Sequence, residues 1–179
     1  MLDTATLASC TGASVARATL FVDSLNEAMQ AYEINSTARQ AAFLSEIGYE
    51  SGYLVYTTEL WGPTPVQQGY EGRADLGNTQ PGDGPLFRGR GLIMITGRAN
   101  YTAAAEALCL DCVNQPTLLA MPEWASVSAA WWWSTHGLNT LADAGNYEAI
   151  TRTINGGLTG YEGRCTLWAQ AKQALGVGT

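Results

Sequence analysis

Two glutamates that lie nine positions apart could together carry out acid–base chemistry. Glu50 is in the stretch "GYESGYL" and Glu59 is in "TTELWGP". Hydrolysis of a glycosidic bond needs such a pair, because one carboxylic acid must protonate the departing oxygen while a second carboxylate activates water or attacks carbon. Most glutamates are solvated surface groups. The local setting of each residue therefore has to distinguish a catalytic pair from two ordinary side chains.

The neighbours of Glu50 favour a proton donor. Gly48 and Gly52 allow the backbone or a ligand to approach closely on both sides. Tyr49 and Tyr53 offer apolar walls, and an apolar environment raises the pKa of a carboxyl group, as a general acid requires. These residues suggest the role of Glu50 but do not fix its distance from any second carboxylate.

Other catalytic chemistries find less support in the sequence. The single histidine, His136, stands at a helix end in "WSTHGLN", where capping or packing is the commoner role, and no GxSxG occurs. Gly89 and Gly91 in "RGRGLIM" lack the further residues of a phosphate-binding loop. One CxxC, "CLDC", has no second pair at zinc-site spacing. We therefore expect no metal site. The sequence leaves open the disulfide state of Cys10, Cys109, Cys112 and Cys165.

Length and charge limit the classes of partner. The 179 residues, 46% of them apolar, suffice for one core, so we expect a single domain over residues 1–179. A net charge of −7, with nine lysine and arginine residues, leaves no basic face for nucleic acid. No apolar run approaches the roughly 20 residues that cross a bilayer, and the N-terminus lacks the pattern of an export signal. These features predict a soluble protein without an integral membrane segment.

Helical periodicity places Glu50 at the end of a helix. Residues 14–32 carry apolar side chains at three- and four-residue intervals, which predicts an amphipathic helix. A second helix should follow, with Thr37 and Gln40 placed for a capping box. We expect this second helix to end between Gly48 and Gly52, immediately around Glu50.

The composition changes between Thr57 and Pro85, which is dense in Gly, Pro, Asn and Asp and shows no sustained period. Compact domains rarely keep irregular segments longer than about 15 residues unless these serve a binding site or a lid. A short extended piece and a helix over residues 97–108 should follow. Three further helices are predicted in "EWASVSAAWWWSTHG", "NYEAITRTI" and "TGYEGRCTLWAQAKQALG". Three consecutive tryptophans in the first of these cannot share one helix face, so at least one should pack in the core.

Three stretches, taken together and in this order, resemble glycoside hydrolase family 19. They are "GYESGYL", "YEGRADLGNTQPGDGPLFRGRGLIMITGRANY" and "INGGLTGYEGR". The resemblance runs from about residue 15 to 176 and is closest to the compact bacterial and phage branch of endolysin-type muramidases and chitinase-like enzymes. It implies a mainly α, lysozyme-like single domain with two lobes, a substrate cleft and a long Gly/Pro-rich loop. It also implies cofactor-free, inverting hydrolysis of a β-1,4-linked N-acetylated aminosugar polymer.

The resemblance implies catalytic roles for three residues. Glu50 matches the general acid, although Tyr49 stands where the family usually has histidine. Glu59 matches the general base, and Glu71 is the alternative base. Thr96 matches the residue that helps to position the attacking water.

A further set of residues is predicted to bind substrate. Met94 stands where the family commonly has a glutamine that contacts sugar, which puts one substrate hydrogen bond in doubt. Arg164 is expected to pair with a carboxylate of the cleft. The full predicted set is Tyr53, Met94, Asn100, Asn155 and Arg164.

We predict, on this resemblance, a monomeric endolysin-type muramidase that cleaves peptidoglycan. The short single-domain form and the lack of a cysteine-rich chitin-binding module favour this substrate. The protein would be made in the bacterial cytoplasm and reach the cell wall through a holin or another export route. A chitinase acting on N-acetylglucosamine polymers is the main alternative, and a non-catalytic sugar-binding protein on the same fold is the second. The sequence does not distinguish a phage endolysin from a bacterial or prophage effector.

Overall fold

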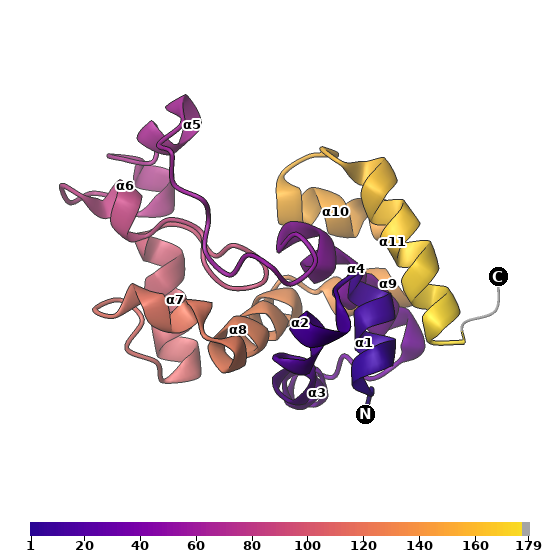
Figure 1. The fold of residues 1–179 in the computed structure, drawn as a ribbon. Coiled ribbons are helices and arrows are strands. Elements are labelled where there is room, and N and C mark those ends of the chain that lie inside the picture. Colours follow the sequence, from indigo (N-terminus) through magenta and orange to yellow (C-terminus); the bar gives the residue numbers. More distant parts are fainter. Residues whose placement is uncertain (177–179) are drawn as a thin grey trace.

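The computed structural model describes residues 1–176, and the regular structure there is almost entirely helical (Figure 1). Residues 177–179 of the expected 1–179 domain lie outside the described part. The helices are, in chain order, α1 (Thr4–Thr11), α2 (Val15–Thr19), α3 (Val22–Ala31), α4 (Thr37–Glu50), α5 (Pro65–Gln68), η1 (Ala74–Leu76), α6 (Asp83–Leu86), α7 (Arg98–Leu108), η2 (Pro116–Ala120), α8 (Pro122–Thr135), α9 (Leu138–Asp143), α10 (Tyr147–Asn155) and α11 (Tyr161–Ala174). The β pairing within residues 1–176 consists of two isolated bridges, Thr58 with Arg90 and Arg90 with Ile95. The predicted mainly α fold class is confirmed.

Helix α4 lies at the centre of the larger group of helices. Helices α1, α9 and α11 pack against it, and α3 packs against α8. Residues 41–48 of α4 are all buried. Phe43 meets Trp133 of α8 edge to face, with ring centroids 5.4 Å apart. Burial of each large apolar side chain contributes about 1.5–3 kcal/mol. Glu50 therefore ends a helix that the core holds firmly in place.

A second group of elements, α5, η1, α6 and α7, lies on the opposite side of the molecule from α10 and α11 (Figure 1). The buried Asp83 carboxylate accepts hydrogen bonds from Arg98 Nε at 2.8 Å and from its Nη2 at 2.5 Å. The buried Asn78 amide accepts from the Arg98 backbone N–H at 2.8 Å and donates to the Tyr70 carbonyl at 2.9 Å. These buried polar contacts anchor the irregular segment to α7.

The first part of the chain differs from the predicted helices. Residues 14–32 form two helices, because the backbone N–H groups of Leu20 and Phe21 bond to carbonyls three residues back and tighten the turn between α2 and α3. Helix α4 is capped by Ser36, whose hydroxyl accepts from a backbone N–H in the first turn at 3.2 Å. The prediction of Thr37 as the cap was wrong by one residue, since the earlier hydroxyl holds the extended capping conformation.

The segment between Thr57 and Pro85 contains three short helices, so the prediction that it lacks regular structure was wrong. Thr64 and Gln67 form a reciprocal capping box around α5, and Pro65 occupies its first turn. These local signals suffice for one turn of helix. Each helix here has three or four residues, which is too short to produce a visible hydrophobic period.

The later helices follow the prediction. Helices α7, α8, α10 and α11 occupy the expected stretches, and Gly176 follows α11 with a positive φ of 69°. Trp133 is fully buried, whereas Trp131 and Trp132 are half-buried, which confirms that one indole packs in the core. The short helices α1 and α9 were not predicted.

Three further features of the structure concern the cysteines, membrane spanning and metal binding. All four cysteines are free; Cys10 and Cys112 are buried and Cys109 is exposed. Across residues 1–176, no helix is both long and apolar enough to span a membrane. The same residues hold no cluster of His, Cys, Asp and Glu arranged to bind a metal ion.

Candidate active site

Glu50 is the last residue of α4, and the chain turns sharply after it. The Ser51 hydroxyl donates to the Ile47 carbonyl at 2.6 Å and accepts from the Leu54 N–H at 2.9 Å. Residues 52–54 all have positive φ values, between 58° and 66°. Left-handed backbone is disfavoured for residues other than glycine, so buried contacts must hold this turn. Leu54 is fully buried and supplies them. The turn leaves Glu50 at the helix end with 18% of its side chain exposed.

One buried arginine joins Glu50 to a second carboxylate. Arg164 of α11 donates from Nη2 to Oε1 of Glu50 and from Nη1 to Oε2 of Glu46, one turn earlier on α4. Arg164 is 3% exposed and Glu46 is fully buried. Thr151 of α10 donates to the other oxygen of Glu46 at 2.5 Å. The predicted pairing of Arg164 with a site carboxylate is therefore present, and we call these residues the Glu46–Arg164–Glu50 cluster.

Burial raises the pKa of Glu46 above its usual range, although Thr151 and Arg164 act in the opposite direction. For Arg164, burial lowers the pKa, but Glu50 and Glu46 outweigh it and raise the pKa overall. Two carboxylates share one guanidinium, so the cluster is electrically neutral when it holds one proton.

Sequence reasoning missed Glu46. The available signal was its spacing of four residues from Glu50, which puts the two carboxylates on one helix face, within a stripe that is otherwise apolar. A fully buried carboxylate requires a partner. The partner comes from α11, which lies 118 residues further along the chain.

The tyrosines that flank Glu50 face other groups. The Tyr49 ring packs on Arg164, whose guanidinium carbon lies 4.5 Å from the ring centroid. Tyr49 fills the space beside two glycines. A Cβ added to Gly160 would lie 2.1 Å from the Tyr49 Oη, and a Cβ added to Gly163 would lie 2.8 Å from the Tyr49 Cε2. Tyr53 packs against Gly12, which follows the end of α1, and is 49% exposed. The Arg164 guanidinium is thus the contact that the structure gives Glu50, in place of the predicted tyrosine walls.

Glu59 is held by three neutral donors. Gln67 Nε2 and the Tyr70 hydroxyl donate to Oε1 at 2.9 Å and 3.3 Å. The Gly89 N–H donates to Oε2 at 3.0 Å, and the Glu59 N–H donates back to the Gly89 carbonyl at 2.8 Å. Burial raises the pKa of Tyr70, and the charge of Glu59 adds to the increase. The carboxylate is therefore oriented by neutral groups alone.

Gly89 brings the predicted base together with two other predicted site residues. A Cβ added to Gly89 would lie 3.2 Å from Met94 Cβ, 3.3 Å from Thr96 Oγ1 and 3.4 Å from Glu59 Cβ. Thr96 donates to the Met94 carbonyl at 2.8 Å. A side chain at position 89 would force these groups apart, so the glycine allows the three residues to meet.

The remaining predicted residues lie at different places. Asn100, in the first turn of α7, donates to the Thr96 carbonyl at 2.7 Å and so belongs beside the Glu59 group. Asn155 is exposed at the end of α10. The carboxylate of Glu71, the alternative base, accepts from the N–H groups of Gly82 and Gly84 at 2.6 Å and 2.9 Å. Its oxygens already serve to fix the backbone before α6.

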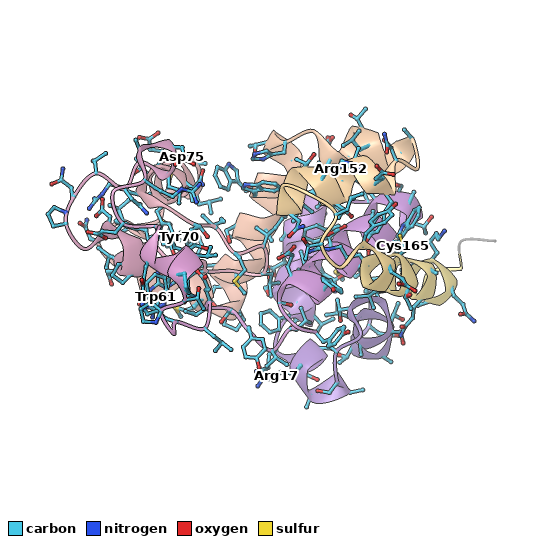
Figure 2. The ribbon with its side chains drawn as sticks, turned by 90° about the horizontal axis from the view of Figure 1, so that it is seen from above. Arg17, Trp61, Tyr70, Asp75, Arg152 and Cys165 are labelled. Carbon is cyan, nitrogen blue, oxygen red and sulfur yellow. The ribbon has the colours of Figure 1, made fainter. Side chains whose placement is uncertain are left out.

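The two carboxylate groups draw their partners from opposite sides of the molecule. Figure 2 shows Trp61 and Tyr70, next to Glu59, on one side, and Cys165, which follows Arg164 on α11, on the other. The arrangement offers two carboxylates that share one guanidinium on one side and an oriented carboxylate beside a threonine hydroxyl on the other. Groups of these types can carry out acid–base catalysis on a bound substrate.

Known proteins of similar sequence are hydrolases. No protein-family model matches the chain. The chain is 31% identical over 157 residues to a glycosyl hydrolase family 19 domain-containing protein of Haemophilus influenzae, a match that covers 73% of this chain and 76% of that protein. It is 32% identical over 133 residues to an endochitinase of Arabidopsis thaliana, covering 73% of this chain and 44% of that protein. The chain therefore spans less than half the length of this plant relative.

Solved structures of similar fold are chitinases. Chitinase C from Streptomyces griseus HUT6037 superposes with a TM-score of 0.76 at 23% identity, covering 99% of this chain and 77% of that chain. A bacterial family 19 chitinase gives a TM-score of 0.74 at 22% identity, covering 98% and 95%. These likenesses establish the fold, and the Haemophilus influenzae relative establishes the family. The chain belongs to glycosyl hydrolase family 19.

Proposed function

We propose that the chain hydrolyses β-1,4 bonds between N-acetylated aminosugars with inversion, using Glu50 as general acid and Glu59 as general base. The observation that carries the proposal is the contrast between the two carboxylates. Glu50 shares one guanidinium with Glu46, whereas Glu59 accepts from three neutral donors. The two carboxylates therefore have chemically different partners, a shared cation for Glu50 and neutral donors for Glu59.

The acid step would use the free oxygen of Glu50. Arg164 binds Oε1, and within residues 1–176 no hydrogen bond reaches Oε2. A proton on Oε2 would face the glycosidic oxygen, while Arg164 fixes the plane of the carboxyl group. Once the proton has left, the guanidinium lies in contact with the carboxylate that forms and stabilises its charge.

The base step would use Glu59 and a water beside Thr96. The Thr96 hydroxyl donates to the Met94 carbonyl, so its oxygen lone pairs are available to accept from that water. Inversion requires the water between the base and the sugar, with the two carboxyl groups about 6.5–9.5 Å apart. The substrate would lie in a cleft between the α4–α11 side and the α5–α7 side. Residues 57–85, which carry Glu59, would form one wall of this cleft.

The substrate we favour is chitin. Relatives named as endochitinases and chitinases support it. The net charge of −7 adds a physical reason, because an acidic protein is repelled at long range by an anionic wall and not by an uncharged polymer. Peptidoglycan has the same linkage and N-acetyl groups, so the same residues would cleave it. If peptidoglycan is the substrate, we still predict that the protein acts as a monomer and is released to the cell wall through a holin.

Release of reducing ends from colloidal chitin and from purified peptidoglycan, measured side by side, tests the proposal. Mass spectrometry of the fragments identifies the bond that is cut. We expect release from chitin by the wild type and none by Glu50→Gln, which keeps the shape of the side chain. Release from peptidoglycan alone would reverse the order of substrates. Binding to both polymers without release from either would contradict hydrolysis and favour a sugar-binding protein.

A further inference from the structure

A pocket of about 310 Å³ lies between α3 and α8, and we call it the α3–α8 pocket. The two helices contact each other and lie in the lower part of Figure 1. Trp124 and Val127 of α8 supply apolar walls. Ala28 and Ala31 of α3 line the other side with small side chains, which leaves the space between the helices open. None of the lining residues belongs to the candidate active site.

Hydrogen bonds between the two helices fix the spacing of the pocket walls. The Ser126 hydroxyl of α8 donates to the Pro122 carbonyl at 2.8 Å. The Ser24 hydroxyl of α3, which lines the pocket, hydrogen-bonds to the Ser126 hydroxyl at 2.9 Å. Ser126 is fully buried, so this contact belongs to the packed core. The pocket is therefore formed before anything binds, which reduces the entropy cost of binding.

The rim of the α3–α8 pocket carries only negative charge. Glu27 of α3 and Glu123 of α8 line the pocket and are exposed. The exposed Asp23 stands one turn before Glu27 on the same face of α3. Neither helix contains a lysine or an arginine. Within residues 1–176, no ion pair involves these three carboxylates, so they are free to meet the cations of a partner.

An apolar pocket with a carboxylate on each side is complementary to one kind of segment. Exposed apolar patches with a polar rim mark interaction sites. A helix can lay an apolar stripe into such a pocket and hold basic side chains on both sides of that stripe. An extended strand cannot, because its side chains alternate between two opposite faces.

We propose that the α3–α8 pocket docks a cationic amphipathic helix of a partner protein. A large apolar side chain of that helix would pack on Trp124, and lysine or arginine residues beside it would pair with Glu27 and Glu123. The proposal goes beyond the proposed hydrolysis and does not depend on it. The partner would be held at a place other than the candidate active site.

The same charges disfavour two other occupants. A second copy that docked through this face would bring the same acidic rim, and the whole chain carries a net charge of −7. Like charges brought together at an interface weaken association. An anionic lipid surface would be repelled for the same reason, because it attracts basic segments and not acidic ones.

The test titrates the full chain calorimetrically with a synthetic helical peptide of about 14 residues, which gives about four turns. Its leucines recur at three- and four-residue spacing, and lysines flank the leucine stripe. We expect saturable binding at one site that weakens as the salt concentration rises. A peptide with glutamate in place of every lysine should not bind. Trp124→Ala, and separately the double variant Glu27→Lys with Glu123→Lys, should each weaken binding about tenfold or more.

Two control variants separate docking at this pocket from a general attraction to an acidic protein. Glu106→Lys with Glu162→Lys makes the same change in net charge at exposed positions of α7 and α11. Trp61→Ala removes another half-buried indole, outside α3 and α8. Both controls should bind the lysine peptide with nearly wild-type affinity. Thermal unfolding confirms that each variant retains its fold.

Three calorimetric results would overturn the proposal. They are equal binding of the two peptides, equal weakening in the pocket variants and their controls, and no binding of the lysine peptide. Sedimentation of the free wild type tests the competing occupant. A dimer that Trp124→Ala converts to a monomer would assign the pocket to a second copy and would also overturn the proposal. The proposed hydrolysis is measured separately, by release of reducing ends, so its failure is distinguishable from each of these results.

Discussion

Glu50 ends a 14-residue helix and takes its partner from a helix 114 residues further along the chain, whereas Glu59 finds its three donors within 30 residues. The environment of Glu50, the proposed acid, thus depends on the packing of α4, α10 and α11, and so on the complete core. The environment of Glu59, the proposed base, depends on a local set of turns around α5 and Gly89. Changes to the fully buried partner Glu46 should therefore affect stability as well as chemistry, whereas changes at Glu50 itself and near Glu59 should affect mainly chemistry.

The largest expected effect is that of Glu50→Gln on turnover. The amide keeps the hydrogen bond from Arg164 but cannot donate a proton as an acid. We expect activity to fall by about 1,000-fold, within the range for a general acid, with little change in thermal unfolding. Steady-state assays on chito-oligosaccharides measure the loss. Retention of more than a few per cent of wild-type activity would remove Glu50 as the acid.

Glu59→Ala should reduce activity by about 100-fold, because no base would remove a proton from the attacking water, although the water could still reach the sugar. Added azide or formate should restore part of the rate, since a small anion can occupy the vacated space. The anion should not rescue Glu71→Gln, because Glu71 binds backbone N–H groups.

Glu106→Gln, at an exposed position of α7, controls for the loss of one charge on the same side of the molecule. Near-normal activity of Glu59→Ala would transfer the base role to Glu71.

Glu46→Gln tests whether the acid depends on the core. Misplacement of Glu50 should reduce activity about tenfold or more. The pKa of Glu46 is raised in the folded protein, so the folded state binds the proton more tightly than the unfolded chain does. Wild-type stability should therefore fall as pH rises from about 4.3, the unfolded value, through the raised folded pKa.

Urea unfolding between pH 4 and pH 8 should show this slope in the wild type and a smaller slope in Glu46→Gln. Glu148→Gln, which removes a 52%-exposed carboxylate paired with Arg152, should leave both the slope and the activity close to wild type. Identical slopes in the wild type and Glu46→Gln would contradict the buried cluster.

Asp83→Asn should have the smallest effect on activity and a measurable effect on stability. Hydrogen bonds from Arg98 hold the pKa of Asp83 below its usual range. Its contribution is present above the unfolded pKa, about 3.9, and is lost as pH falls through the folded pKa. We expect a loss of about 2 kcal/mol at pH 7. Hydrogen exchange should show faster opening near the Arg98 amide than in α4, and equal opening in both regions would contradict local anchoring.

The sequence predicted the surroundings of Glu59 better than those of Glu50. Glu59, Met94 and Thr96 lie in or beside one continuous set of motifs, and they do meet around Gly89. Arg164 was predicted to pair with a site carboxylate, and it does. Glu46 was missed because its burial depends on α10 and α11 folding back onto α4, which no local pattern reports.

The errors in the fold have a similar cause. Composition correctly marked residues 57–85 as unusual, but helices of one turn are too short for periodicity to reveal them. The choice between Ser36 and Thr37 as the α4 cap depends on which residue takes the extended backbone, and two adjacent hydroxyl side chains leave this undecided in the sequence. Tyr53 was assigned to the wall around Glu50, yet the left-handed turn directs it elsewhere.

The central claim is that Glu50 and Glu59 act on opposite sides of one glycosidic bond, with water attacking from the Glu59 side. Proton NMR of the first products from chito-oligosaccharide cleavage, recorded before the anomers equilibrate, tests this directly. The account predicts that the α-anomer appears first. Initial release of the β-anomer would contradict inversion and the roles assigned to both carboxylates.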